Sequence, residues 1–111
     1  MMAELGQRRS ERVLLDVPVV VCGESVDQLA FEEETFTVTV NAHGALLMLA
    51  SPVGLGQHVR LINQASHEEC DARVSYKGAD HAGLSQVAVE FAQPCPRFWP
   101  VSPAPSSWPR R

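Results

Sequence analysis

The stretch that decides the fold class reads Thr35-Phe36-Thr37-Val38-Thr39-Val40, the second half of a longer segment at residues 29–40. Its apolar side chains alternate with threonines at every position. A period of two residues is that of a β-strand, and one apolar face opposite one polar face is typical of an antiparallel sheet with a solvated side. We therefore expect a strand here, with Phe36, Val38 and Val40 on one face and the threonines on the other.

Shorter segments with the same signal follow, separated by turn-forming residues, at 44–50, 57–62, 70–76 and 87–91. The glycine-containing residues 77–83 are expected to form a loop. With the strand at 29–40 and one more upstream, the pattern predicts an all-β domain, a six-stranded antiparallel barrel over residues 12–92. The expected core consists of Val38, Val40, Leu47, Val59, Leu61, Val74, Val89 and Phe91.

The upstream strand, residues 13–22, is apolar and β-branched but contains Pro18. Proline has no N–H to donate to a neighbouring strand, so it is confined to strand edges, strand beginnings or bulges. This strand should therefore lie at an edge of the sheet or be broken by a bulge.

Two terminal segments lie outside the expected barrel at residues 12–93. Residues 1–11 are polar and charged and are expected to form a flexible basic arm. Residues 94–111 contain six prolines, a density that excludes regular strand and helix. The same tail carries three large aromatic residues, Phe98, Trp99 and Trp108. A flexible tail and a tail that packs across the barrel are therefore both compatible with its composition.

Length and composition narrow the possible functions. The chain has 111 residues, enough for one domain, and a net charge of −4, which argues against a general binder of nucleic acid polymers. Cys22, Cys70 and Cys95 are an odd set without Cys-x-x-Cys spacing, so we expect free thiols in a reducing cytosol and no metal site. The absence of a signal-like or membrane-spanning apolar stretch predicts a cytoplasmic protein without membrane insertion.

The basic arm carries the strongest functional signal. Arg8 and Arg12 are four residues apart just before the first strand, and Arg9 lies between them. Guanidinium groups bind phosphate oxygens two at a time and stack on purine rings, so such an arm can close over a phosphate-bearing ligand. Arginine-rich termini without a ligand are also common, and the arm alone does not distinguish the two interpretations.

Two short strings together give this arm a context: Arg8-Arg9-Ser10-Glu11-Arg12 and Thr39-Val40-Asn41-Ala42-His43-Gly44. They resemble the RxxxR and (D/N)xSxxG motifs of the PilZ domain, a small β-barrel that binds the bacterial second messenger cyclic di-GMP. The resemblance covers about residues 8 to 93. The first motif is intact; in the second, Gly44 matches, Asn41 stands in place of serine, and Thr39 stands in place of Asp or Asn.

The resemblance implies a ligand site for cyclic di-GMP made of Arg8, Arg9, Arg12, Thr39, Asn41 and Gly44. A carboxylate at position 39 would accept two hydrogen bonds from a guanine edge, which the Thr39 hydroxyl cannot match. Gly44 is expected to adopt positive φ in a tight turn.

Two functions remain open at this stage. One is a non-catalytic cyclic di-GMP receptor that acts on an unidentified protein partner, and the other is an interaction module of the same fold that has lost the nucleotide. No arrangement of acid, base and nucleophile points to an enzyme, and no cofactor is expected.

Overall fold

The computed structural model describes residues 11–101 and 105–108. This part of the chain forms seven β-strands and one short 3-10 helix at Pro96–Phe98. The strands are β1 (Val13–Leu14), β2 (Pro18–Glu24), β3 (Ala30–Asn41), β4 (Gly44–Leu49), β5 (His58–Asn63), β6 (Glu69–His81) and β7 (Leu84–Phe91). No helix among the described residues is long and apolar enough to cross a membrane.

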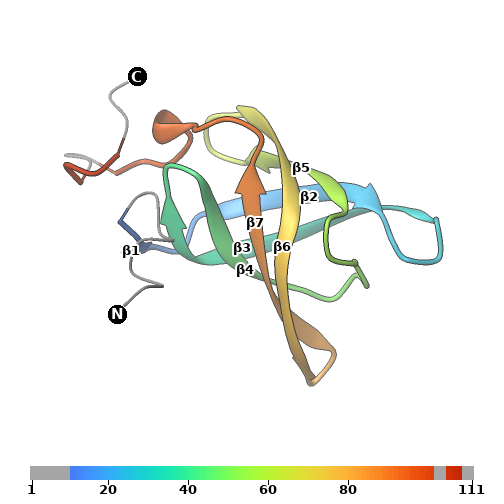
Figure 1. Cartoon of the computed structure of the whole chain (residues 1–111). Helices are drawn as coiled ribbons and strands as arrows, with labels where there is room; N and C mark the ends of the chain where they lie inside the picture. Colours follow the sequence, from blue (N-terminus) through green and yellow to red (C-terminus); the bar gives the residue numbers. More distant parts are fainter. Residues whose placement is uncertain (1–10, 102–104, 109–111) are drawn as a thin grey trace.

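The strands form one antiparallel sheet in the order β1-β3-β2-β5-β6-β7-β4, and a further pairing of β3 with β4 closes it into a barrel (Figure 1). The predicted six-stranded antiparallel barrel is therefore confirmed, with β1 as an additional strand beside β3. Closure removes the unpaired edges that an open sheet would expose. It also brings the C-terminal half of β3 next to β4 and, one strand further, β7.

Residues 13–22 are broken, but between two separate strands. The alternative of an edge strand is wrong, because β2 pairs with β3 on one side and with β5 on the other. The segment divides into β1 and β2, and Pro18 is the first residue of β2. Thr37 of β3 bridges the break: its hydroxyl donates to the Leu15 carbonyl at 2.6 Å and accepts from the Val17 N–H at 2.9 Å. These two bonds satisfy backbone groups that the broken ladder leaves without a strand partner, and they hold a polar side chain in the interior at 2% exposure.

The placement of Val38 in the core is wrong. Val38 is 37% exposed and Phe36 is 57% exposed, whereas Thr37 points inward. The register of β3 against β4 shifts between Thr37 and Thr39, which marks a β-bulge there. A bulge adds a residue on one strand and interrupts the alternation. Thr37 and Val40 therefore both face the interior, although they are three positions apart and would lie on opposite faces of a regular strand.

The remaining predicted core positions are buried: Val40, Leu47, Val59, Leu61, Val74, Val89 and Phe91. They come from five of the six barrel strands and pack in one cluster with Val19 and Val21 of β2. These residues fill the barrel interior, so any ligand site has to lie on the outside or at the ends.

The loop predicted at residues 77–83 is wrong. Strand β6 continues to His81, and a two-residue turn of Ala82 (φ 57°) and Gly83 (φ 85°) leads into β7. Positive φ at both central residues matches the twist of the flanking strands, as in type I′ hairpins. A register shift between Val74 and Tyr76 also breaks the alternation of β6 and leaves Tyr76 on the outer face.

The described part of the C-terminal tail packs against the barrel. Phe98, Trp99 and Trp108 are all buried. Phe98 and Trp99 contact each other edge to face at 4.7 Å, and Trp99 stacks on Phe91 of β7 at 5.9 Å. Of the two alternatives for this tail, packing is therefore the one observed. The expectation that the tail contains no helix is wrong, because one 3-10 turn forms at Pro96–Phe98.

Candidate ligand-binding site

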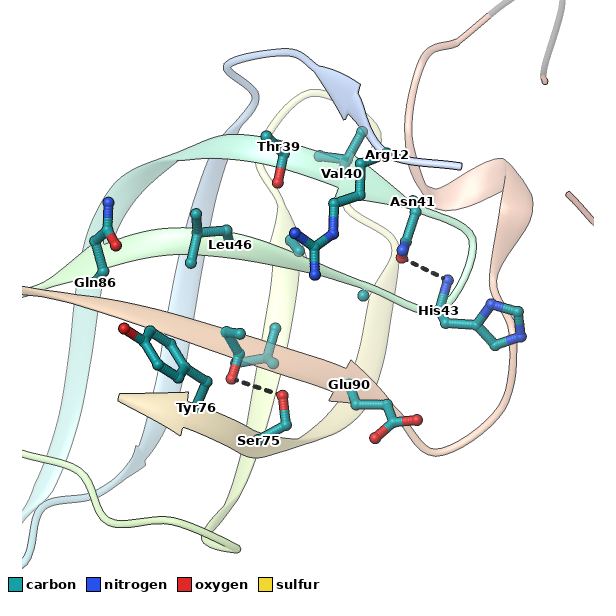
Figure 2. A pocket seen from close by; sticks show the side chains of 14 residues that line it. Arg12, Thr39, Val40, Asn41, His43, Leu46, Ser75, Tyr76, Gln86 and Glu90 are labelled. Atoms are coloured by element: carbon teal, nitrogen blue, oxygen red, sulfur yellow. Dashed lines mark hydrogen bonds between the residues drawn. The ribbon is translucent and has the colours of Figure 1, made fainter. Parts of the chain in front are cut away.

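A cavity of about 540 Å³ lies on the outer face of the barrel, over β3, β4, β7 and part of β6 (Figure 2). Its volume is within the range of small-molecule sites. It is lined by Arg12, Thr39, Val40, Asn41, His43, Gly44, Ala45, Leu46, Ser75, Tyr76, Gln86, Ala88, Val89 and Glu90.

Strand geometry explains how β3 contributes to this cavity. Successive side chains of a strand point to opposite faces, so Thr39 and Asn41 share the outer face. Both line the cavity, and the side chain of Val40 between them is buried in the core. On the adjacent strand β4, Leu46 pairs with Thr39 and Gly44 pairs with Asn41.

Gly44 does not have positive φ, so that expectation is wrong; Gly56 and Gly83 are the described glycines that do. The requirement for glycine at position 44 is steric. A Cβ placed there would lie 1.9 Å from the carbonyl oxygen of Val89 in β7. Gly44 therefore allows β4 and β7 to approach closely beneath the cavity.

The turn at residues 41–44, which joins β3 to β4, is fixed by side-chain and tail contacts. The Asn41 side-chain oxygen accepts from the His43 N–H at 3.0 Å, and the Asn41 carbonyl accepts from the Trp99 indole N–H at 2.8 Å. The Cys95 N–H donates to the Ala42 carbonyl at 2.8 Å. The C-terminal tail thus braces the turn that carries the second motif.

Arg12, the residue immediately before β1, lines the cavity. Figure 2 shows its side chain extending across β3 and β4 toward the middle of the cavity. Arg12 is exposed, and among the residues that the structure describes no carboxylate forms an ion pair with it. Its charge is therefore available for an anionic group.

The residue before Arg12 is held by the end of the tail. The Trp108 indole N–H donates to the Glu11 carbonyl at 2.7 Å, and the Glu11 N–H donates to the Ser107 hydroxyl at 2.8 Å. The backbone at the root of the arm is therefore anchored. Arg8 and Arg9 lie outside the described residues, as does the rest of the expected flexible arm at residues 1–10.

Among the lining residues that were not predicted from the sequence, four bring polar side chains from the two strands beyond β4: Ser75 and Tyr76 of β6, and Gln86 and Glu90 of β7. The inward alternation of Val87, Val89 and Phe91 does indicate that Gln86 and Glu90 face outward. No sequence signal, however, indicates that the outer face of β7 adjoins that of β3, because this depends on β4 lying between them. The outward position of Tyr76 depends on the irregularity in β6.

A closed six-stranded antiparallel barrel of this topology, with an arginine-bearing segment lying over its outer face, is a PilZ-like β-barrel. Comparison with solved structures supports this class. The chain is similar to the Bacillus subtilis inhibitor of motility, MotI/DgrA, with a TM-score of 0.63 and 21% sequence identity. The match covers 79% of this chain and 44% of that one, so the chain spans less than half the length of the protein it matches. No protein-family model and no curated protein matches the sequence.

Proposed function

We propose that this protein is a non-catalytic receptor for cyclic di-GMP, as its resemblance to the PilZ motifs implies. The observation that carries the proposal is that Arg12 lines one cavity with Thr39, Asn41 and Gly44, although it precedes β1 and they belong to the β3–β4 hairpin. These are all the predicted site residues that belong to the described part of the chain. The similarity of the fold to MotI/DgrA is consistent with a signalling role.

The chemistry of the cavity suits a cyclic dinucleotide. Arg12 offers a guanidinium fork for a phosphate, and Arg8 and Arg9 of the arm are proposed to add the further positive charge that a diester ligand requires. Glu90 also lines the cavity and contributes an acidic side chain to it. Thr39 would offer its single hydroxyl to a base edge.

In the proposed mechanism the ligand orders the basic arm, and the ordered arm presents a new surface to a protein partner in the cytoplasm. Ordering a flexible segment costs about 1–2 kcal/mol per residue of backbone. The ligand contacts have to exceed that cost before binding can change the surface. No chemical step is part of this function.

The decisive experiment is isothermal titration of the full chain with cyclic di-GMP. Arg8→Ala and Arg12→Ala should each weaken binding about ten-fold or more, because a charge-assisted hydrogen bond contributes about 1.5–3 kcal/mol. Binding should also weaken as salt concentration rises, since the contacts to phosphate are ionic.

Arg60→Ala is the matched control. Arg60 lies on β5, outside the cavity lining, and pairs across the surface with Glu69 and Asp71 at 3.6 Å. Its removal should leave the affinity nearly unchanged. If the wild-type protein gives no heat of binding even at high protein concentration, the receptor function is refuted and the alternative below stands.

Thr39→Asp should tighten cyclic di-GMP binding and improve discrimination of guanine over adenine. A carboxylate at this position would accept two hydrogen bonds from the guanine edge, while the arm arginines offset its charge. The measurement is the affinity for cyclic di-GMP and for cyclic di-AMP, with Thr39→Val as a control that keeps the shape and removes the hydroxyl. Unchanged or weaker binding of cyclic di-GMP by a folded Thr39→Asp protein would contradict the assignment of position 39.

The alternative function is a protein-interaction module that has lost the nucleotide. It is favoured by an exposed apolar surface on β1 and β3, where Leu14 is 81% exposed and Phe36 and Val38 also face solvent. Leu14 pairs with Thr39, so this surface adjoins the cavity. In the receptor function the same surface would contact the partner once the arm is ordered.

A further inference from the structure

Two cysteines that are 25 positions apart in the sequence meet where the C-terminal tail leaves the barrel. The Sγ atoms of Cys70 in β6 and Cys95, just before the 3-10 helix, are 2.7 Å apart. Both side chains are half-buried and both are free thiols. Cys22, the third cysteine, lies on β2 and has neither of the others as a sulfur partner among the described contacts.

The Cys70–Cys95 pair lies where the C-terminal tail meets β6, so a bond between the two sulfurs would restrain the tail. Cys95 begins the segment whose next residues include Phe98 and Trp99, which are buried in the core. The Asn63 side chain holds the same segment by donating to the Phe98 carbonyl at 2.7 Å. Noncovalent contacts therefore already hold Cys95 against Cys70, and a bond between the sulfurs would need them to approach by about 0.6 Å to reach disulfide length.

We propose that Cys70 and Cys95 are a reversible dithiol–disulfide site that locks the C-terminal tail onto β6. The co-reactant is a small-molecule disulfide of the glutathione type. One thiol of the pair attacks a sulfur of the reagent and expels one reagent thiol, which leaves a mixed disulfide. The second thiol then attacks the protein sulfur of that mixed disulfide and expels the other reagent thiol. Two electrons pass to the reagent, and the two protein protons end on its two released thiols.

The surroundings indicate the order of attack. Burial first, and then the hydrogen bond with Cys95, raise the pKa of the Cys70 thiol above its ordinary value. Because the thiolate is the nucleophile, the raised pKa makes Cys70 a slow first attacker. When Cys95 carries the mixed disulfide, Cys70 lies beside the sulfur that it has to attack.

A disulfide between Cys70 and Cys95 would also affect the turn at residues 41–44. The segment that it fixes includes Trp99, whose indole N–H braces the turn at residues 41–44. Closing a loop of this length restricts the unfolded chain, so oxidation should raise the midpoint of thermal unfolding by about 10 °C. A thiol reductant should reverse the shift.

The test is to incubate the full chain with excess oxidised glutathione, remove the reagent and measure the intact mass. The wild-type mass should fall by about 2 Da, the two hydrogens lost on forming one disulfide, and peptide mapping without reductant should join the Cys70 and Cys95 peptides. Cys22→Ser should behave as the wild type. Cys70→Ser and Cys95→Ser should both lose the cross-link.

Three outcomes would overturn the proposal, and all three are measured on the wild-type protein. One is a stable glutathione adduct on Cys95 with no loss of mass by cross-linking. The second is a disulfide that involves Cys22. The third is a Cys70–Cys95 cross-link with an unchanged unfolding midpoint, which would show that the bond does not lock the tail. Because the wild-type mass decides first, misfolding of a serine variant does not rescue the idea.

Discussion

Gly44→Ala is expected to destabilise the barrel by about 3 kcal/mol or more, at the upper end of the cost of inserting atoms into a packed structure. The added methyl group would lie 1.9 Å from the Val89 carbonyl oxygen. That oxygen belongs to the backbone of β7, so the clash cannot be relieved by a side-chain rotation. Strands β4 and β7 would have to separate, and the ladder between them would be disturbed along residues such as Ala45, which pairs with Val89.

Gly54→Ala is the matched control for this change. Its added methyl group would have only the Val26 side chain nearby, at 3.9 Å, which is an ordinary contact. Urea unfolding followed by circular dichroism should show a large drop in midpoint for Gly44→Ala and a small change for Gly54→Ala. Equal midpoints for the two variants would contradict the close approach of β4 and β7.

Trp99→Ala is expected to cost about 3–5 kcal/mol, the range for removing a large aromatic side chain from a core. Trp99 is 2% exposed and contacts two other aromatic rings, those of Phe91 and Phe98. Its indole N–H also donates to the Asn41 carbonyl, so the substitution would release the turn at residues 41–44 as well as leave a cavity.

Phe36→Ala provides the comparison, because Phe36 is also a large aromatic residue but is mostly exposed on the outer face. Phe36→Ala should change the free energy of unfolding by less than about 1 kcal/mol. Trp99→Phe separates the two contributions, since it keeps a ring in the core and removes the indole donor. If Trp99→Ala unfolds at the same urea concentration as the wild type, the tail does not contribute to the core as described here.

Much of the barrel follows from local pattern. A strand shows itself by a period of two within a few residues, and that signal does not depend on the partner strand. The strands β4, β5 and β7, and the burial of Val40, Leu47, Val59 and Val89, follow from it directly. The two motif strings are likewise visible in the sequence as residues and spacings.

The alternation of apolar and polar residues does not reveal where a bulge interrupts a strand. Val38 reads as a core residue, yet a bulge turns it outward because Thr37 is needed inside to bond Leu15 and Val17, which lie 22 and 20 positions upstream. The same limit applies to Tyr76, which reads as a continuation of the core face of β6 and lies at the cavity instead.

The sequence by itself therefore determined the class of fold, most of the core and the residues that make up the candidate motifs. Only the tertiary structure decided which of these residues meet. Closure of the sheet brings Tyr76 and Gln86 to the cavity of Thr39, and docking of the tail brings Cys95 to Cys70 and Trp108 to Glu11. The physical reason is range: alternation is set by neighbouring residues, whereas these meetings depend on contacts between segments 25 to 97 positions apart, such as Cys70 with Cys95 and Glu11 with Trp108.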